Sequence, residues 1–110
     1  MIDWGRVAQL CNEIGADDFE EIVEIFLEEV EAEIEALRQS AYDTPLETRL
    51  HFLKGSALNL GFESFSNLCG EGEAGASNGQ ASNIDIPSIL ESYEASKIEF
   101  LDQRHTQLSR

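Results

Sequence analysis

The stretch TPLETRLHFLKGSALNLG, residues 44–61, carries the clearest helix signals in this 110-residue chain. Thr44 at the cap, Pro45 at the first helical position and Glu47 three residues after Thr44 form a capping box, which predicts where the helix begins. Gly61 suits the left-handed conformation that closes a helix, and we expect no further role for it. Between these ends, apolar residues alternate at spacings of four and three, as on a buried helix face: Leu46, Leu50, Leu53, Ala57 and Leu60.

His51 lies outside this apolar stripe. At about 100° per residue it is about 140° from the middle of the stripe, so its side chain is expected to point away from the core. Helix geometry places Glu47, Lys54, Gly55 and Leu58 around the ring. Neutral imidazole is a nucleophile that is well populated near neutral pH, and Lys54 adds a cation one turn away. Glycine inside a helix costs roughly 1 kcal/mol relative to alanine, so Gly55 indicates that access to the ring is needed. These residues predict a site that accepts and holds a phosphoryl group.

Two helices are predicted before this stretch. The first is capped by Asp3 and ends at Gly15. The second opens at Asp17 or Asp18 and ends at a break over residues 40–43. Its acidic residues fall mostly on the face opposite its apolar stripe, as in a bundle helix with one side in water. The stripe comprises Phe19, Val23, Phe26, Val30, Ile34 and Leu37.

Two more helices are predicted after Gly61. One starts near Phe62, and several glycines weaken it, so we expect it to fray after about Glu73. A polar loop leads to Asp85, which opens the last helix together with Pro87. The apolar residues expected on this last helix are Ile86, Leu90, Tyr93, Phe100 and Leu101.

Four long amphipathic helices with short connections predict an all-α fold, an up-and-down four-helix bundle with an additional short N-terminal helix. The length suits one domain over residues 1–110 that buries roughly two thirds of its unfolded surface. No apolar run approaches the ~18 residues that span a bilayer, and MIDWGRVAQL lacks the features of a signal peptide. We therefore expect a cytoplasmic protein, and the initiating Met1 with the capped helices favours a free-standing one.

The formal net charge of −15 argues against two classes of partner. Nucleic acid is bound by neutralising its phosphates with Lys and Arg, and anionic membranes attract basic segments, so neither partner is expected. We interpret the acidic residues of the second helix as a solvated face, with a steering surface for a basic partner as the alternative. These residues are Asp17, Asp18, Glu20, Glu21, Glu24, Glu28, Glu29, Glu31, Glu33 and Glu35.

Other chemistries have weaker signals. Glu47 and His51 are four residues apart and could ligate a metal, but a zinc or di-iron site needs two or more further ligands. The other histidine, His105, has no acidic residue three or four positions on. No G-x-S-x-G, Walker A or kinase-type glycine loop occurs, so neither a hydrolase nor a chain that uses ATP by itself is expected. Cys11 and Cys69 belong to no C-x-x-C motif, and we interpret both as reduced, buried small residues.

The stretch His51–Gly61, with its continuation FESFSNLCGEGE, resembles the histidine phosphotransfer (HPt) domain of bacterial phosphorelays. The pattern of that family is a histidine, then lysine, glycine and a small residue at three, four and five positions on, with a glycine about ten on. The positions that match are His51, Lys54, Gly55, Ser56 and Gly61. Three positions also fit commoner family residues: Leu60, Cys69 and Glu73.

The resemblance implies that His51 accepts a phosphoryl group from the aspartyl phosphate of a receiver domain and passes it to another receiver. Lys54 would help to hold the phosphate, and Gly55 would leave the imidazole accessible. Magnesium and the acidic residues that drive the reaction would belong to the receiver, so the chain needs no cofactor. It is expected to be a phosphocarrier without its own ATP site, and not an enzyme.

The expected partners are response-regulator receiver domains and a hybrid histidine kinase, bound by a monomer. Leu58 departs from the small residue common in the family and is a candidate for an apolar docking patch beside His51. Phe62 is a second candidate, with core packing as an equal alternative. Ser56 lies on a different face, so packing or a backbone bond is as plausible for it as chemistry. The alternative function is a non-catalytic acidic helical adaptor that binds a signalling partner without phosphorylation.

Overall fold

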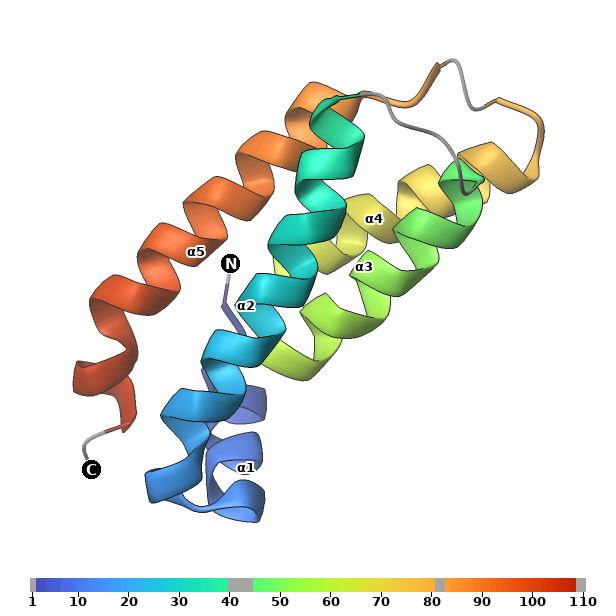
Figure 1. Cartoon of the computed structure of the whole chain (residues 1–110). Helices are drawn as coiled ribbons and strands as arrows, with labels where there is room; N and C mark the ends of the chain where they lie inside the picture. Colours follow the sequence, from blue (N-terminus) through green and yellow to red (C-terminus); the bar gives the residue numbers. More distant parts are fainter. Residues whose placement is uncertain (1, 40–44, 81–82, 109–110) are drawn as a thin grey trace.

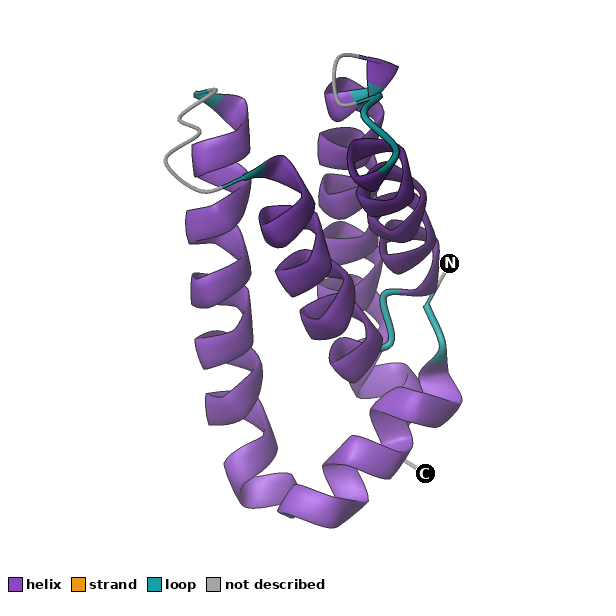
Figure 2. Ribbon diagram, turned by 90° about the vertical axis from the view of Figure 1, so that its right-hand side faces the viewer, coloured by secondary structure: helices purple, strands orange, loops and turns teal. Residues whose placement is uncertain are grey.

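The computed structural model describes residues 2–39, 45–80 and 83–108, and five helices make up most of this part of the chain (Figure 1). The all-α prediction is confirmed: α2 to α5 form an up-and-down bundle in which α3 lies beside α4 and α5 beside α2. The short α1 packs at one end of the bundle, as Figure 2 shows. The helices are α1 (Trp4–Ile14), α2 (Ala16–Arg38), α3 (Leu46–Leu60), α4 (Glu63–Ser77) and α5 (Ile86–Leu108).

The helix boundaries agree with most of the predicted end signals. The Asp3 carboxylate accepts a bond from the Arg6 backbone N–H at 3.1 Å and caps α1. Asp85 caps α5 through the Ser88 backbone N–H at 3.2 Å. The third helix begins at Leu46, one residue later than predicted, whereas Thr44 and the predicted break at 40–43 lie outside the described residues.

Gly61 does more than end α3, which corrects the expectation that it is only a cap. Its φ of 77° is left-handed, as predicted. Its carbonyl also accepts a bond of 2.7 Å from the Asp3 backbone N–H. A Cβ at this glycine would lie 2.7 Å from the Asp3 carbonyl oxygen, so the close approach of the N-terminal segment to α3 requires glycine here.

The core follows the inner faces of the four long helices. The predicted stripes of α2 and α3 are buried, apart from Phe26 and Leu46, which are half-buried. The stripe predicted for α5 is corrected, because Ile89 is buried whereas Leu101 is 38% exposed. Apolar side chains that are at most 1% exposed include Val7, Val23, Leu37, Leu50, Leu53, Ala57, Leu60, Phe65, Cys69, Tyr93 and Phe100.

Phe62 belongs to this core, and the alternative of a docking role on the surface is wrong. Only 1% of Phe62 is exposed. Its ring centroid lies 5.5 Å from that of Phe100 and 6.3 Å from that of Tyr93, in tilted arrangements. Phe62 therefore joins the start of α4 to the middle of α5.

α4 continues to Ser77, which corrects the prediction that it frays after about Glu73. Gly72 is buried against α3, and a Cβ there would lie 2.8 Å from Leu50 Cδ1. The missing side chain lets the two helices pack closely. Tertiary packing therefore outweighs the low helix propensity of glycine in this segment.

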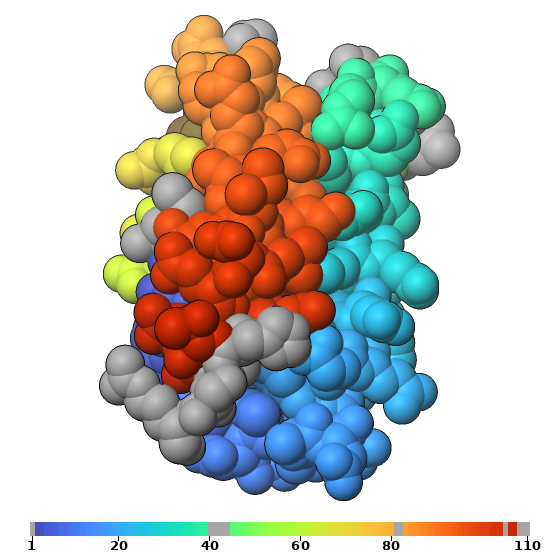
Figure 3. All heavy atoms as spheres, turned by 90° about the vertical axis from the view of Figure 1, so that its left-hand side faces the viewer, coloured from blue at the N-terminus to red at the C-terminus, as the bar shows by residue number. Residues whose placement is uncertain are grey.

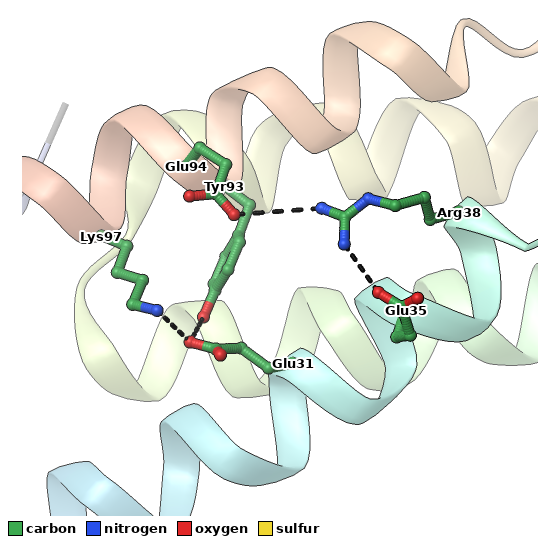
Figure 4. A network of polar contacts seen from close by, with 6 residues as sticks. All are labelled: Glu31, Glu35, Arg38, Tyr93, Glu94 and Lys97. Atoms are coloured by element: carbon green, nitrogen blue, oxygen red, sulfur yellow. Dashed lines mark hydrogen bonds and ion pairs between the residues drawn. The ribbon is translucent and has the colours of Figure 1, made fainter.

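Polar contacts join α2 to α5 along one side of the bundle, the face that Figure 3 presents. Glu31 accepts hydrogen bonds from the Tyr93 hydroxyl at 2.9 Å and from Lys97 Nζ at 2.5 Å, as Figure 4 shows. Chiefly because of the bond from Lys97, the pKa of Glu31 lies below its ordinary value, while burial raises the pKa of Tyr93. On another side of α2, Glu33 pairs with the buried Arg49 of α3 at 2.6 Å. Glu20 of α2 also pairs with Arg104 of α5 at 2.8 Å. Three of the ten acidic residues of α2 thus contact other helices, and the other seven are exposed, as expected for a solvated face.

Candidate functional site

His51 lies on the outer face of α3, as the helical periodicity predicted. Its side chain is 70% exposed, whereas Leu50 and Leu53 on the same helix are fully buried. The ring is thus carried by a helix whose opposite face is locked into the core. Such a helix holds a reactive side chain more precisely than a loop does.

Glu73 of α4 lies between His51 and Lys54. Its Oε2 is 2.8 Å from His51 Nδ1, and its Oε1 is 2.9 Å from Lys54 Nζ. The Glu73 side chain is 20% exposed and its Oε1 is shielded from solvent. One carboxylate from α4 therefore holds two functional groups of α3 one turn apart. The sequence pattern had flagged Glu73 only as a fitting family position and assigned it no role.

The charge state of Glu73 determines the proton position on His51. Lys54 lowers the pKa of Glu73 most, the bond from His51 lowers it further, and partial burial opposes both. Glu73 is therefore an acceptor-only carboxylate near neutral pH, so Nδ1 of a neutral His51 must donate the proton between them. This assignment leaves Nε2, on the other side of the exposed ring, with an available lone pair.

The surface next to the ring is open and partly apolar. A Cβ at Gly55 would have nothing within 4 Å, so the helix surface there is unobstructed. Leu58, one turn further, is 54% exposed, in agreement with a surface position. Phe52, which the sequence-based prediction did not include, is 41% exposed and lies about 100° around the helix from His51. Its signal was present: Phe52 follows His51 and falls outside the apolar stripe of α3.

The remaining candidate residues lie elsewhere. Ser56 is only 9% exposed, consistent with packing rather than chemistry. Glu47 is exposed at the start of α3, and the side chain of His105 lies outside the described part. Within residues 2–39, 45–80 and 83–108, no group of three or more His, Cys, Asp or Glu could hold a metal ion. Burial raises the pKa of the Cys69 thiol to about 12, and Cys11 is half-buried, less than expected.

None of the described helices has an apolar stretch long enough to cross a membrane.

Comparison with known proteins shows the family of this chain. Residues 21–109 match the family model of the Hpt domain. Two relatives called phosphorelay protein LuxU, from Vibrio vulnificus strains YJ016 and CMCP6, are each 31% identical over 84 residues. The matched region covers 74% of this chain and 73% of each relative. No solved structure matches significantly.

The helical bundle and the family match together define the class of protein as a phosphotransfer domain. The chain belongs to the Hpt domain family, and its function is histidine phosphotransfer in phosphorelay signalling. The match begins at residue 21, so α1 lies outside the part of the chain that the family model covers.

Proposed function

We propose that His51 is the residue of this phosphocarrier that accepts and donates the phosphoryl group. The observation that carries the proposal is the bond between His51 Nδ1 and Glu73 Oε2 at 2.8 Å on an otherwise exposed ring. It fixes the proton on Nδ1 and makes Nε2 the nucleophile.

In the proposed step, the Nε2 lone pair attacks the phosphorus of an aspartyl phosphate on a receiver domain. The N–P bond forms as the P–O bond to the aspartate breaks, and the electron pair leaves with the aspartate carboxylate. The Nδ1 proton stays on the ring, which becomes a positively charged phosphoimidazolium. Glu73 stabilises this positive charge, and no proton has to leave. Transfer to a second receiver is the same step reversed.

Lys54 supplies the cation for the moving phosphoryl group. Charge accumulates on the phosphoryl oxygens in such transfers, and a nearby ammonium stabilises it. Its Nζ is already held by Glu73 at 2.9 Å, and its side chain is 36% exposed, so it remains in reach of a ligand. The divalent cation of the reaction belongs to the receiver in this proposal, and the chain needs no cofactor and no ATP site of its own.

The partners in this proposal are response-regulator receiver domains and a hybrid histidine kinase. An aspartyl phosphate reaches the ring only if the surface around His51 is covered in the complex. Gly55 leaves space for that approach, and Leu58 offers apolar area to be buried. We further propose that the chain is a single domain that works as a cytoplasmic monomer, without binding nucleic acid or membranes.

The test is transfer of radioactive phosphate from a panel of phosphorylated receiver domains. We expect label on the wild-type chain that is acid-labile and base-stable, as a phosphoramidate is. His51→Gln should abolish labelling, and the matched control His105→Gln should leave it unchanged. Label that persists on His51→Gln protein would overturn the assignment of His51. Receiver binding without any label on wild-type protein would favour the adaptor alternative.

A further inference from the structure

The glycines of α4 are unexplained by helix propensity, because glycine lowers the stability of a helix interior. Gly70, Gly72 and Gly75 stand within six residues. They differ in what an added Cβ would meet: Leu50 in the core at 2.8 Å for Gly72, and Ile84 at an ordinary 3.7 Å for Gly75. Gly72 is thus explained by packing, whereas Gly75 lacks a close neighbour of that kind.

Gly70 borders the functional site. A Cβ at Gly70 would lie 3.3 Å from Cδ of Lys54, closer than such contacts normally are. The methylene stem of Lys54 therefore lies directly over the bare backbone of α4 at this glycine. Three residues further along α4, Glu73 meets the end of the same side chain, with 2.9 Å between Oε1 and Nζ. Residues three apart share a helix face, so both contacts come from one side of α4.

Lys54 needs such guidance because its stem has several rotatable bonds and its ammonium has no preferred direction of its own. Glu73 fixes only the charged end. The methylene stem of Lys54 also has to pass close to the backbone of α4, and a side chain at position 70 would occupy that space. The backbone of Lys54 contacts the same helix, since the Ser66 hydroxyl donates to its carbonyl at 3.4 Å.

We propose that Gly70 is a positioning residue: its missing side chain seats the stem of Lys54, so that the ammonium stays beside Glu73 and His51. The effect on phosphotransfer rests on the proposed function of His51, whereas the contact between Gly70 and the stem of Lys54 exists in the unphosphorylated protein. A side chain at this position would lift Lys54 away from Glu73. Glu73 would lose its main counter-charge, and the phosphoryl group would lose its cation.

The experiment compares Gly70→Ala and Gly70→Leu with Gly75→Ala, a glycine-to-alanine change in the same helix without a close contact. The first readout is the pKa of Glu73, followed by carboxyl carbon NMR in unphosphorylated protein. Lys54 is the largest cause of the low pKa of Glu73, so Gly70→Leu should raise it and Gly75→Ala should not.

The second readout is the rate of transfer from a phosphorylated receiver. We expect Gly70→Leu to slow transfer about fivefold, Gly70→Ala about twofold, and Gly75→Ala not at all. In a Lys54→Ala background, Gly70→Leu should have no further effect, because the residue that it displaces is gone. An equal loss in that background would overturn the proposal, since the larger side chain would then obstruct the receiver directly.

Unchanged Glu73 titration in folded Gly70→Leu protein would also overturn the proposal. If Gly70→Leu fails to fold, Gly70→Ala decides in the same way, because it adds a single methyl group. Absence of label on wild-type His51 would refute the proposed function instead. The Glu73 titration needs no phosphate, so it would still test whether Gly70 positions Lys54 beside Glu73.

Discussion

The solvent-facing sides of α2 and α3 differ sharply, although the two helices pack against each other in one bundle. α2 has ten Asp and Glu among its 23 residues, whereas α3 has one Glu among 15. The outer face of α3 instead presents an imidazole, a glycine and two apolar side chains, at positions 51, 55, 52 and 58.

This difference teaches where a strongly acidic protein binds a partner. Charged groups are costly to remove from water, so the cores of interfaces are depleted in them. A face that stays in water can hold many carboxylates, and a face that a partner covers cannot. In a chain of net charge −15, it is therefore informative that the outer face of α3 has a single carboxylate, Glu47. The carboxylate that does approach His51 comes from α4 and is neutralised there by Lys54.

The largest effect is expected for the carboxylate beside His51. Glu73→Ala removes the acceptor of the Nδ1 proton and the anchor of Lys54, so transfer should slow at least about thirtyfold, ~2 kcal/mol in the barrier. Glu28→Ala, on the exposed face of α2, should leave transfer unchanged. Single-turnover transfer from a labelled receiver measures both. Equal effects of the two changes would show that the carboxylate beside His51 is no more important for transfer than one on the exposed face of α2.

Gly55 should show opposite effects on stability and transfer. The space around its missing Cβ is open, so Gly55→Gln should keep or raise the melting temperature, with a gain of roughly 0.5–1 kcal/mol expected for alanine. The larger side chain would stand beside the imidazole, and transfer should fall about tenfold, ~1.4 kcal/mol. Ala32→Gln on the exposed face of α2 is the control. Full-speed transfer in folded Gly55→Gln protein would show that this glycine does not serve access.

The apolar side chain beside the site should matter for docking. Leu58 is 54% exposed, and burying this exposed part in a complex is worth about 1 kcal/mol. Leu58→Asp should therefore raise the Kd for the receiver about fivefold. Far-UV helicity should remain unchanged. Ile25→Asp on α2, which is 45% exposed, is the matched control and should not affect Kd. Unfolding of Leu58→Asp protein would mean that Leu58 contributes to the core.

The smallest effect concerns a carboxylate of α2 that serves stability. The pKa of Glu31 is held below the ordinary 4.5, so its carboxylate stabilises the fold at any pH above 4.5. This contribution disappears as the pH falls through the lowered pKa of the folded protein. Glu31→Gln should lower the free energy of unfolding by about 0.5–1 kcal/mol at pH 7, a partly exposed ion pair being worth no more. The difference should vanish on acidification. Denaturant unfolding at both pH values measures it, and a difference that persists in acid would exclude the ion pair as its origin. Glu24→Gln is the exposed control.

Much of the fold and part of the site could be predicted from the sequence. The stripes of α2 and α3, the outward direction of His51 and the left-handed Gly61 all follow from contacts within one helix or turn. These properties repeat every three or four residues, and the geometry of a single helix relates them directly to the sequence. The same reasoning placed Lys54 and Gly55 beside the ring.

The contacts between helices were decided only by the tertiary structure. Glu73 lies 22 residues from His51 along the chain, and only the packing of α4 on α3 brings its carboxylate to the imidazole. The same packing buries Phe62 against α5, keeps α4 helical past Glu73 and gives Gly70 its contact with Lys54. Local periodicity determines which face of a helix is apolar. Which residues of two helices meet depends on their relative position and rotation, which are set by how all the side chains between them fill the core.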